Sequence, residues 1–405
     1  RAAHDRDDML GAVNLFVRAA ALLLGDDPDL ARLYTSLGAA LTEAGQLERA
    51  MKTLDDAQRI AAVNGDEGQF AHARVQALMS GLKLAPNKAT EEIAQAIPGL
   101  RRQFETGLDE LGLCQTLQLQ AAMHWIHARS AAAEDAWQRA AAYARRINDR
   151  RQLAEILGWL ASAALWGPTP AAEGIRRCED YLNEIGNHPR GQAVILLHMA
   201  GLYAMLDQIA VAQATLSRAK SHLDILGPTM TAAETEPAAF IAMLAGDPVT
   251  AEMHLRLGYE SLSQMGEKDF LSTTAALLAR AIVAQGGQRY TEASQLIEIS
   301  QDAAGGEDLS AQIIGQGLSA RIMADRGRHA EALELASSAV ALAAQTDLLS
   351  QHADALLDLT HVLAASGRFP EAQAAATQAL ELCQRKGNLP GARESLGYLT
   401  QYAHT

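Results

Sequence analysis

The sequence predicts an all-α protein, a right-handed superhelical solenoid of helix pairs that repeat about every 40 residues. The first observation is a repeated motif, because GRHAEA at 327–332 is followed by GRFPEA at 367–372. The second is the composition: hydrophobic residues make up 49% of the 405 residues, but aromatic residues only 4%. The apolar residues are mainly Ala and Leu, which favour helices. No alternating Val/Ile/Thr-rich runs indicate strands.

The Gly-to-Ala motif recurs along most of the chain. Copies include GQLERA at 45–50 and GDPVTA at 246–251, and the last five motif alanines are 39, 42, 39 and 40 residues apart. We expect these alanines to be buried where two helix backbones approach closely, because a larger side chain would push the helices apart. The predicted repeat-packing residues are Gly38, Ala50, Ala57, Ala212, Ala251, Ala293, Ala332, Ala339, Ala372 and Ala379.

Residues 30–63 show how each unit is expected to form two helices. Tyr34, Gly38 and Leu41 are three or four residues apart, so they share one face of a first helix. Gly45 ends that helix, as Gly often does just after a helix C-terminus. The motif Glu then suits the positive N-terminus of the second helix.

The whole chain, residues 1–405, is predicted to be a single solenoid. Residues 1–25 are predicted to form the second helix of a leading partial repeat, and residues 26–388 about nine helix pairs. Residues 389–405 are predicted to form a C-terminal capping helix. Because the prediction opens on a second helix, we expect the chain to be part of a longer protein.

The unit at 30–63 resembles the tetratricopeptide repeat. Its aromatic, Leu-Gly, Gly and Ala positions match the order of that repeat, and the unit that ends at Ala379 matches it through Leu356, Gly367 and Ala372. The period near 40 is longer than the usual 34 residues of a tetratricopeptide repeat. The resemblance therefore implies an array of such pairs with longer helices.

Four longer segments resemble the C-terminal helical tail of bacterial STAND-type AAA+ signalling ATPases. In that family a class III adenylate/guanylate cyclase domain or a DNA-binding domain precedes the ATPase, and a repeat tail follows it. The resemblance implies a sensor or docking array, with the upstream ATPase domain of the same polypeptide as a partner. The segments are DRDDMLGAVNLFVRAAALL at 5–23, ALWGPTPAAEGIRRCEDYL at 164–182, LRLGYESLSQMGEKDFLSTTAALLARAI at 255–282 and LELCQRKGN at 380–388.

The second of these segments contains the loop Gly-Pro-Thr-Pro at 167–170. Proline fixes φ at a value that suits the first turn of a helix, so we predict a helix that starts at Pro170. Thr169 is the predicted cap of that helix.

The sequence lacks the motifs of common catalytic and cofactor sites. It contains no GxxxxGK[ST], HExxH or GxSxG pattern, and no strand that a GxGxxG could follow. We therefore predict no catalytic residue, no cofactor and no enzyme activity for this chain. His124 and His127 are three residues apart, but zinc needs three or four ligands, so no metal site is predicted.

Charge and cysteine usage restrict the partners and the compartment. The formal net charge of −14, from 34 basic and 48 acidic residues, argues against nucleic acid as a partner. No run of 18 apolar residues indicates a membrane span. Cys114, Cys178 and Cys383 lie far apart and form no CxxC pair, which favours a cytoplasmic location.

One section of the chain is a candidate binding surface. All four tryptophans lie between 125 and 166, and residues 101–177 carry ten Arg against eight acidic residues in an otherwise acidic chain. Trp and Arg are enriched at binding hot spots, although the same tryptophans could fill gaps between repeats and the arginines could be solvated. The predicted effector or partner residues are His124, Trp125, His127, Arg129, Trp137, Arg139, Trp159 and Trp166.

The leading functional hypothesis is a non-catalytic regulatory module whose concave face holds a protein, a peptide or a small effector. The first alternative is a structural scaffold for self-association. The second is an enzyme with an unrecognised site. The sequence does not indicate the ligand or the oligomeric state.

Overall fold

The computed structural model describes residues 9–23, 27–226, 231–304 and 308–402, and within these ranges every regular element is helical. A short 3-10 helix, η3 (Gly287–Arg289), precedes α15. The α-helices are α1 (Met9–Ala20), α2 (Pro28–Glu43), α3 (Leu47–Val63), α4 (Glu67–Leu84), α5 (Pro86–Thr106), α6 (Glu110–Ile126), α7 (Ser130–Arg146), α8 (Arg150–Trp166), α9 (Ala171–Ile185), α10 (Pro189–Met205), α11 (Ile209–Leu226), α12 (Thr231–Leu244), α13 (Pro248–Met265), α14 (Asp269–Ala284), α15 (Tyr290–Ala304), α16 (Leu309–Asp325), α17 (His329–Ala343), α18 (Leu349–Ala365), α19 (Phe369–Lys386) and α20 (Leu389–Tyr402). No helix in these described ranges is long and apolar enough to cross a membrane.

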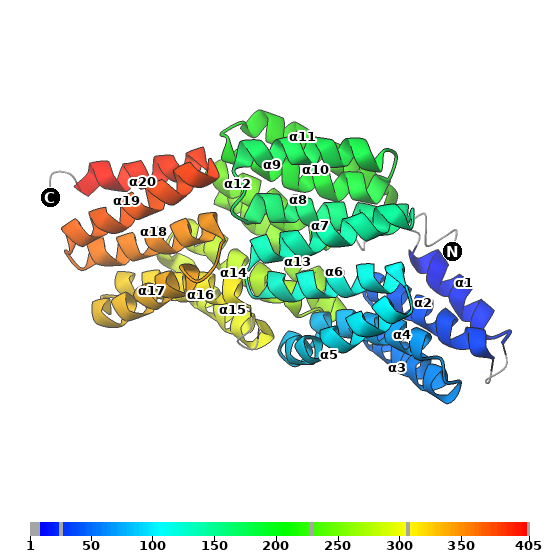
Figure 1. The fold of residues 1–405 in the computed structure, drawn as a ribbon. Coiled ribbons are helices and arrows are strands. Elements are labelled where there is room, and N and C mark those ends of the chain that lie inside the picture. The colour runs from blue at the N-terminus through cyan, green and yellow to red at the C-terminus, as the bar shows by residue number, and fades with distance from the viewer. Residues whose placement is uncertain (1–8, 24–26, 227–230, 305–307, 403–405) are drawn as a thin grey trace.

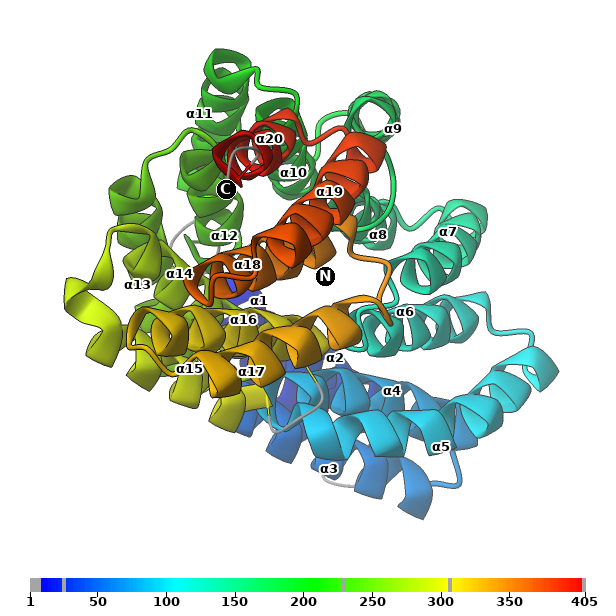
Figure 2. The ribbon, with the colours of Figure 1, turned by 90° about the vertical axis from the view of Figure 1, so that its left-hand side faces the viewer.

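The helices pack as consecutive pairs, from α2 with α3 to α18 with α19. Helix α1 packs against α2, and α20 packs against α19. The even-numbered first helices lie inside and the odd-numbered second helices lie outside (Figure 2). The chain winds as a right-handed superhelix, with the two termini at opposite ends of the molecule (Figure 1). The prediction of an all-α solenoid is therefore confirmed.

Small residues stand where the paired helices cross. A methyl group added to Gly38 would lie 2.4 Å from Cγ of Leu54, so this crossing admits no side chain at all. The expected burial of Ala332 and Ala372 is found, because neither has any exposed area. The same holds for Ala50, Ala57, Ala212, Ala251, Ala293, Ala339 and Ala379.

The motif that marks each turn has a local explanation. Gly327 and Gly367 have φ values of 79° and 74°, in the left-handed region that favours glycine. The Arg that follows each Gly then pairs with the motif Glu three residues later, as Arg328 does with Glu331 and Arg368 with Glu371. The motif therefore encodes a left-handed turn followed by an ion pair across the first turn of a helix.

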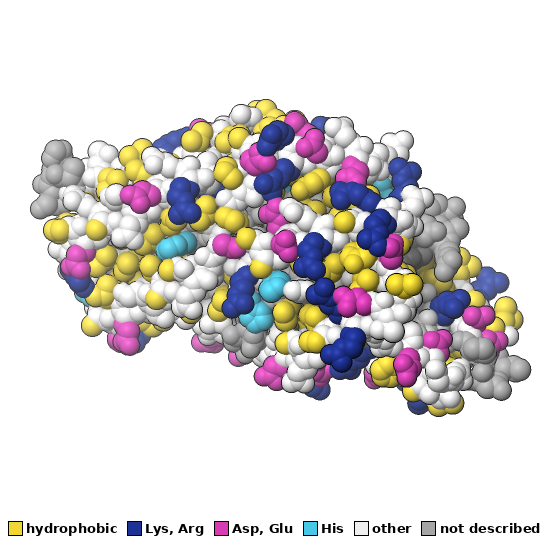
Figure 3. All heavy atoms as spheres, in the orientation of Figure 1, with side chains coloured by type: hydrophobic (Ala, Val, Ile, Leu, Met, Phe, Trp, Pro, Cys, Tyr) yellow, Lys and Arg dark blue, Asp and Glu magenta, His cyan; other side chains and the backbone are white. Residues whose placement is uncertain are grey.

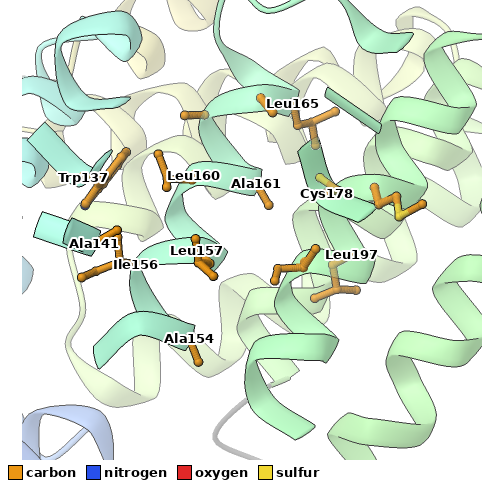
Figure 4. Close-up of a cluster of buried hydrophobic side chains, with 14 of the residues drawn as sticks. Trp137, Ala141, Ala154, Ile156, Leu157, Leu160, Ala161, Leu165, Cys178 and Leu197 are labelled. Atoms are coloured by element: carbon orange, nitrogen blue, oxygen red, sulfur yellow. The ribbon is translucent and has the colours of Figure 1, made fainter. Parts of the chain in front are cut away.

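The largest buried cluster lies between α6 and α11. Figure 4 shows its centre, where Leu157 and Leu165 of α8 face Cys178 of α9 and Leu197 of α10, while Leu160 lies toward Trp137 of α7. These side chains are nearly or completely excluded from water. Helix α8 is therefore held rigidly between its neighbours, which fixes the residues that it turns toward the inner face.

Successive turns of the superhelix touch. Helix α14 lies against α4, five helix pairs earlier in the chain, and the backbone N–H of Lys268 donates to the carbonyl of Lys83 at 2.7 Å. Asp347 accepts hydrogen bonds from the backbone N–H groups of Ser130 and Ala131, at 2.8 and 2.7 Å. A carboxylate at the N-terminus of a helix is favourable, so this contact also stabilises α7.

The most deeply buried contact between turns is made by Lys386, at the end of α19. Its side chain has no exposed area, and its Nζ donates to the carbonyls of Ala164, Gly167 and Thr169 at 2.8, 2.8 and 2.6 Å. These carbonyls belong to the end of α8 and the loop before α9. We call this arrangement the Lys386 contact. It joins the segments 164–182 and 380–388, which the sequence alone had not connected.

The start of α9 differs slightly from the prediction. The helix begins at Ala171, and Pro170 is the residue just before it rather than its first residue. No side chain caps this helix, so Thr169 does not cap it through its hydroxyl. Instead the backbone carbonyl of Thr169 accepts from Lys386.

Candidate functional site

The tryptophans of the predicted binding section form an aromatic stack rather than a surface patch. The rings of Trp137 and Trp159 are nearly parallel with centroids 5.3 Å apart, and Trp125 lies 5.7 Å from Trp137. Trp137 is only 2% exposed, whereas Trp125 and Trp159 are half-buried. Trp159 also lies 6.2 Å from Phe270 of α14, and the fourth, half-buried Trp166, packs on Phe240 of α12 at 4.9 Å. The stack therefore links α6, α7 and α8 to the opposite wall of the superhelix.

Most arginines of the same section lie apart from these tryptophans and form ion pairs at the surface. Arg129 and Arg139 are exposed, and Arg139 pairs with Asp135 on its own helix. Dark-blue and magenta side chains alternate over this part of the surface (Figure 3). The section's other outer ion pairs include Arg101–Glu105, Arg145–Glu184, Arg146–Glu110, Arg176–Glu173 and Arg177–Glu134. The structure thus separates the tryptophans from most of the arginines.

The two histidines lie at the end of α6 and are held locally. Nδ1 of His127 is 2.7 Å from the carbonyl of Met123, one turn earlier. Burial, followed by the positive charges of Arg129 and His127, lowers the pKa of His124. Across the described ranges, no group of three or more His, Cys, Asp or Glu side chains is arranged to hold a metal ion.

Four carboxylates gather on the inner face where α14 meets α12 and α16. We call Glu236, Glu267, Asp269 and Asp308 the acidic cluster. Oε1 of Glu236 accepts from the Thr274 hydroxyl at 2.7 Å. Asp308 accepts from the backbone N–H of Ala311 at 3.0 Å and from the hydroxyls of Ser272 and Thr273. Side chains of α12 and α16 are therefore fixed against one short run of α14.

Burial makes ionisation of the acidic cluster unfavourable. Desolvation raises the pKa of Glu236 to about 7, and it also raises the pKa values of Glu267 and Asp308. The pKa of Asp269 is raised well above its usual range by burial and then by repulsion from Glu267. Lys83 of α4 opposes these shifts at Glu267 and Asp269.

One oxygen of the acidic cluster has no hydrogen-bond donor. Glu267 is only 4% exposed, and its Oε2 accepts from the backbone N–H of Phe270 at 3.2 Å. Its Oε1 is buried without a partner. The Nζ of Lys83 lies over the Phe270 ring, 5.3 Å from its centroid, so a cation and an aromatic face already meet beside the carboxylates.

A second charged group on the inner face is more closely balanced. Asp358 of α18 is fully buried and accepts from Arg280 at 3.0 Å and from Arg321 at 3.2 Å. A methyl group on Gly317 would lie 2.4 Å from Oδ2 of Asp358, so this glycine provides room for the carboxylate. Two arginines thus face this carboxylate and the neighbouring Asp354. Burial raises the pKa of Asp354 to about 7.

The turn between α2 and α3 reaches the inner face of later repeats. Glu43 accepts from Arg151 of α8 at 2.9 Å and from Arg190 of α10 at 2.8 Å. Nearby Glu155 is 39% exposed on its side chain, and burial raises its pKa. The inner face thus combines charged groups with limited access to water.

Comparisons with known proteins identify the fold. No family model matches the chain, and no curated protein sequence matches it. A Rap protein complexed with competence and sporulation factor is similar in structure, with a TM-score of 0.54, 13% identity, and coverage of 92% of this chain and 97% of that chain. The Cut9–Hcn1 hetero-tetramer of the APC/C gives a TM-score of 0.51 at 12% identity, covering 96% of this chain and 83% of that one. These likenesses show a tetratricopeptide-like array of helical repeats.

The acidic cluster and Lys83 were not among the residues predicted from sequence. In the sequence, Glu267 and Asp269 read as ordinary acidic residues at a helix start, where they suit the helix dipole. Asp308 reads as a helix cap, and it does cap α16. Glu236 offered a weak signal, because it is one of two acidic residues, with Glu234, in the mainly apolar helix α12.

Proposed function

We propose that this chain is a non-catalytic interaction array that holds a protein or peptide segment on its inner face. The observation that carries the proposal is the set of half-buried groups there, the aromatic rings Trp125 and Trp159 and the carboxylates Glu236 and Asp269. Such groups combine apolar contact area with oriented acceptors, which is how binding pockets gain both affinity and specificity.

The structural likeness to the Rap protein supports the proposal, because that protein was solved with competence and sporulation factor bound. The aromatic part of the sequence-predicted set, Trp125, Trp159 and Trp166, belongs to the proposed surface. Arg129 and Arg139 do not, because both are exposed and Arg139 lies on the outer helix α7.

Photo-crosslinking tests the proposal. A photoreactive amino acid would replace Glu155 on the inner face, and in a matched variant Glu298, which is exposed on outer helix α15. Both variants would be irradiated with a pool of random-sequence 15-residue peptides. We expect saturable crosslinks at position 155 that unlabelled peptide competes away, and few at 298. Equal labelling at the two positions, or none at 155, would contradict an inner-face binding site.

The more specific function is a sensor array that regulates an ATPase domain in the same polypeptide. It rests on the four segments that resemble STAND-type tails. Exposed apolar side chains on α1 support it, since Leu10, Leu15 and Val17 are 57%, 52% and 42% exposed and offer contacts for another helix. The test is ATP hydrolysis by a polypeptide that contains both parts, measured with and without a peptide that crosslinks at position 155. An unchanged rate would contradict the sensor role and leave the binding role intact.

A further inference from the structure

The acidic cluster contains more negatively charged groups than there are positively charged side chains beside it. Four carboxylates converge, and Lys83 is the basic side chain that acts on Glu267 and Asp269. Lys268 lies between these two in sequence, but its side chain is exposed. Burial raises the pKa values of these carboxyls, and among the basic side chains only Lys83 is seen to oppose that shift at Glu267 and Asp269.

Helix capping explains only part of the cluster. Asp308 caps α16, and one oxygen of Glu267 accepts from the backbone at the start of α14. Neither role involves Glu236, which lies within α12 beyond its first turn and whose carboxylate is fixed by Thr274. Nor does capping use Oε1 of Glu267, a buried acceptor without a donor. Leaving such an acceptor unpaired in a buried position is unfavourable, so a ligand N–H at this position would be favoured.

The neighbouring rings favour an organic cation over a proton or a metal ion. Phe270 already receives the ammonium of Lys83 on its face, and Trp159 stacks on the same ring at a centroid distance of 6.2 Å. Aromatic faces attract cations, and a guanidinium donates several N–H bonds to carboxylates in a plane. No described side chains here form a metal-binding group.

We propose that the acidic cluster, together with Phe270 and Trp159, binds a lysine or arginine side chain of the partner, so that the segment held on the inner face is basic. The inference rests on the proposed function and adds the chemistry of the ligand. Arginine suits the site better than lysine, because its planar guanidinium carries several N–H donors for carboxylate acceptors.

A pH dependence follows from the groups that face the site, which are Lys83 from α4, Glu236 from α12, Glu267 and Asp269 at the start of α14, and Asp308 from α16. A bound cation favours the ionised carboxylates, so binding lowers their pKa values and releases protons. Affinity is therefore expected to increase as the pH rises from 6 to 8.

The test is titration calorimetry with hexa-arginine, hexa-glutamine and hexa-glutamate peptides at physiological salt. We expect hexa-arginine to bind most tightly and to release protons, seen as a binding enthalpy that depends on the ionisation enthalpy of the buffer. Glu236→Gln and Glu267→Gln should each weaken binding roughly tenfold, the value of one charge-assisted hydrogen bond. Glu298→Gln removes the same charge from the outer surface and should change the Kd less than twofold.

Equal weakening by Glu298→Gln would show general attraction to an acidic protein, and it would overturn the proposal. Tighter binding of hexa-glutamine or hexa-glutamate would do the same, as would a Kd that does not change between pH 6 and pH 8. If Glu267→Gln fails to fold by circular dichroism, Glu236→Gln still decides. Random peptides that crosslink at position 155 regardless of their charge would leave the proposed function standing while this inference fails. An absence of crosslinks would remove both.

Discussion

The Lys386 contact and the acidic cluster both lie where one turn of the superhelix meets the next, yet they are opposite in their hydrogen bonding. Lys386 is surrounded by three carbonyls, each within 2.8 Å, and an ammonium group has three N–H bonds to give. At the acidic cluster, one lysine faces several carboxylates, and an oxygen of Glu267 receives no donor. The first contact is complete within the chain, whereas the second is not.

This difference separates a structural contact from a candidate binding site. Both regions bury charge, and burial alone therefore does not indicate function. Desolvation lowers the pKa of Lys386 to about 7, but its three acceptors favour the ammonium form that this geometry uses. The acidic cluster differs because it has a hydrogen-bond acceptor to which no donor of the protein bonds.

The largest expected effect on stability comes from removing the Lys386 contact. Lys386→Met keeps the length of the side chain but leaves the three carbonyls without a donor. We expect a loss of roughly 3 kcal/mol or more in the free energy of unfolding, since each unpaired buried acceptor costs about 1–3 kcal/mol. Urea denaturation measures it, with Lys52→Met on exposed α3 as the control. If the free energy of unfolding falls no further than in Lys52→Met, water replaces the lysine as the donor to the three carbonyls, and the contact is open to solvent.

A smaller effect on stability is expected from Phe270→Ala, which removes a ring beside the acidic cluster. The variant loses the ring contact with Trp159 and the cation–π contact with Lys83, together worth roughly 1–2 kcal/mol. The emission of Trp159 should also shift to longer wavelength as water reaches it. Phe70→Ala, at a ring that is 39% exposed on α4, serves as the control. An unshifted emission spectrum would mean that Phe270 does not shield the tryptophan.

Glu236→Gln should stabilise the protein, and only at higher pH. Burial raises the pKa of Glu236 to about 7, so the folded state favours the protonated carboxyl, and that preference is lost as the pH rises through 7. The neutral amide avoids this loss. We expect a gain on the order of 1 kcal/mol at pH 8 and almost none at pH 5. Thermal melts at both pH values measure it, and a gain of equal size at the two would contradict a buried, titrating carboxyl.

The smallest effect on stability is expected from a change on the outer surface, away from both the Lys386 contact and the acidic cluster. Arg139→Ala removes one exposed pair with Asp135 and should cost at most about 0.5 kcal/mol. It should also leave the hexa-arginine Kd unchanged. A marked loss of peptide binding would place the outer arginines in the binding site after all.

The fold was predictable from sequence because its causes are local. The turn at Gly327 and the crossings at Ala332 and Ala372 depend on residues within one unit. A repeated sequence motif therefore indicates a repeated local structure. The clustering of the tryptophans in space also followed from their clustering in sequence. Their neighbours did not, since Trp159 meets Phe270 only after several repeats have wound around the axis.

The candidate site was not predictable, because it depends on the pitch of the superhelix. Lys83 reaches Phe270 through the contact of α4 with α14, which lie about 200 residues apart in the chain. The pitch is the sum of small rotations at every helix pair, and no single motif encodes it. The outward position of the arginines is a related case. Most of them lie at the surface, as Arg139 does on the second helix α7, where a long charged side chain stays hydrated.

The contact between successive turns also determines how the molecule responds to force. An open solenoid lengthens gradually, because each helix pair rotates slightly against the next when the ends are pulled. Here α4 is joined to α14, and Lys386 joins α19 to the loop after α8. Extension along the axis therefore first requires these distant joints to separate, while compression is blocked by turns that already touch. The protein is a stiff, closed coil, and its compliance is set by a few contacts rather than shared by all its repeats.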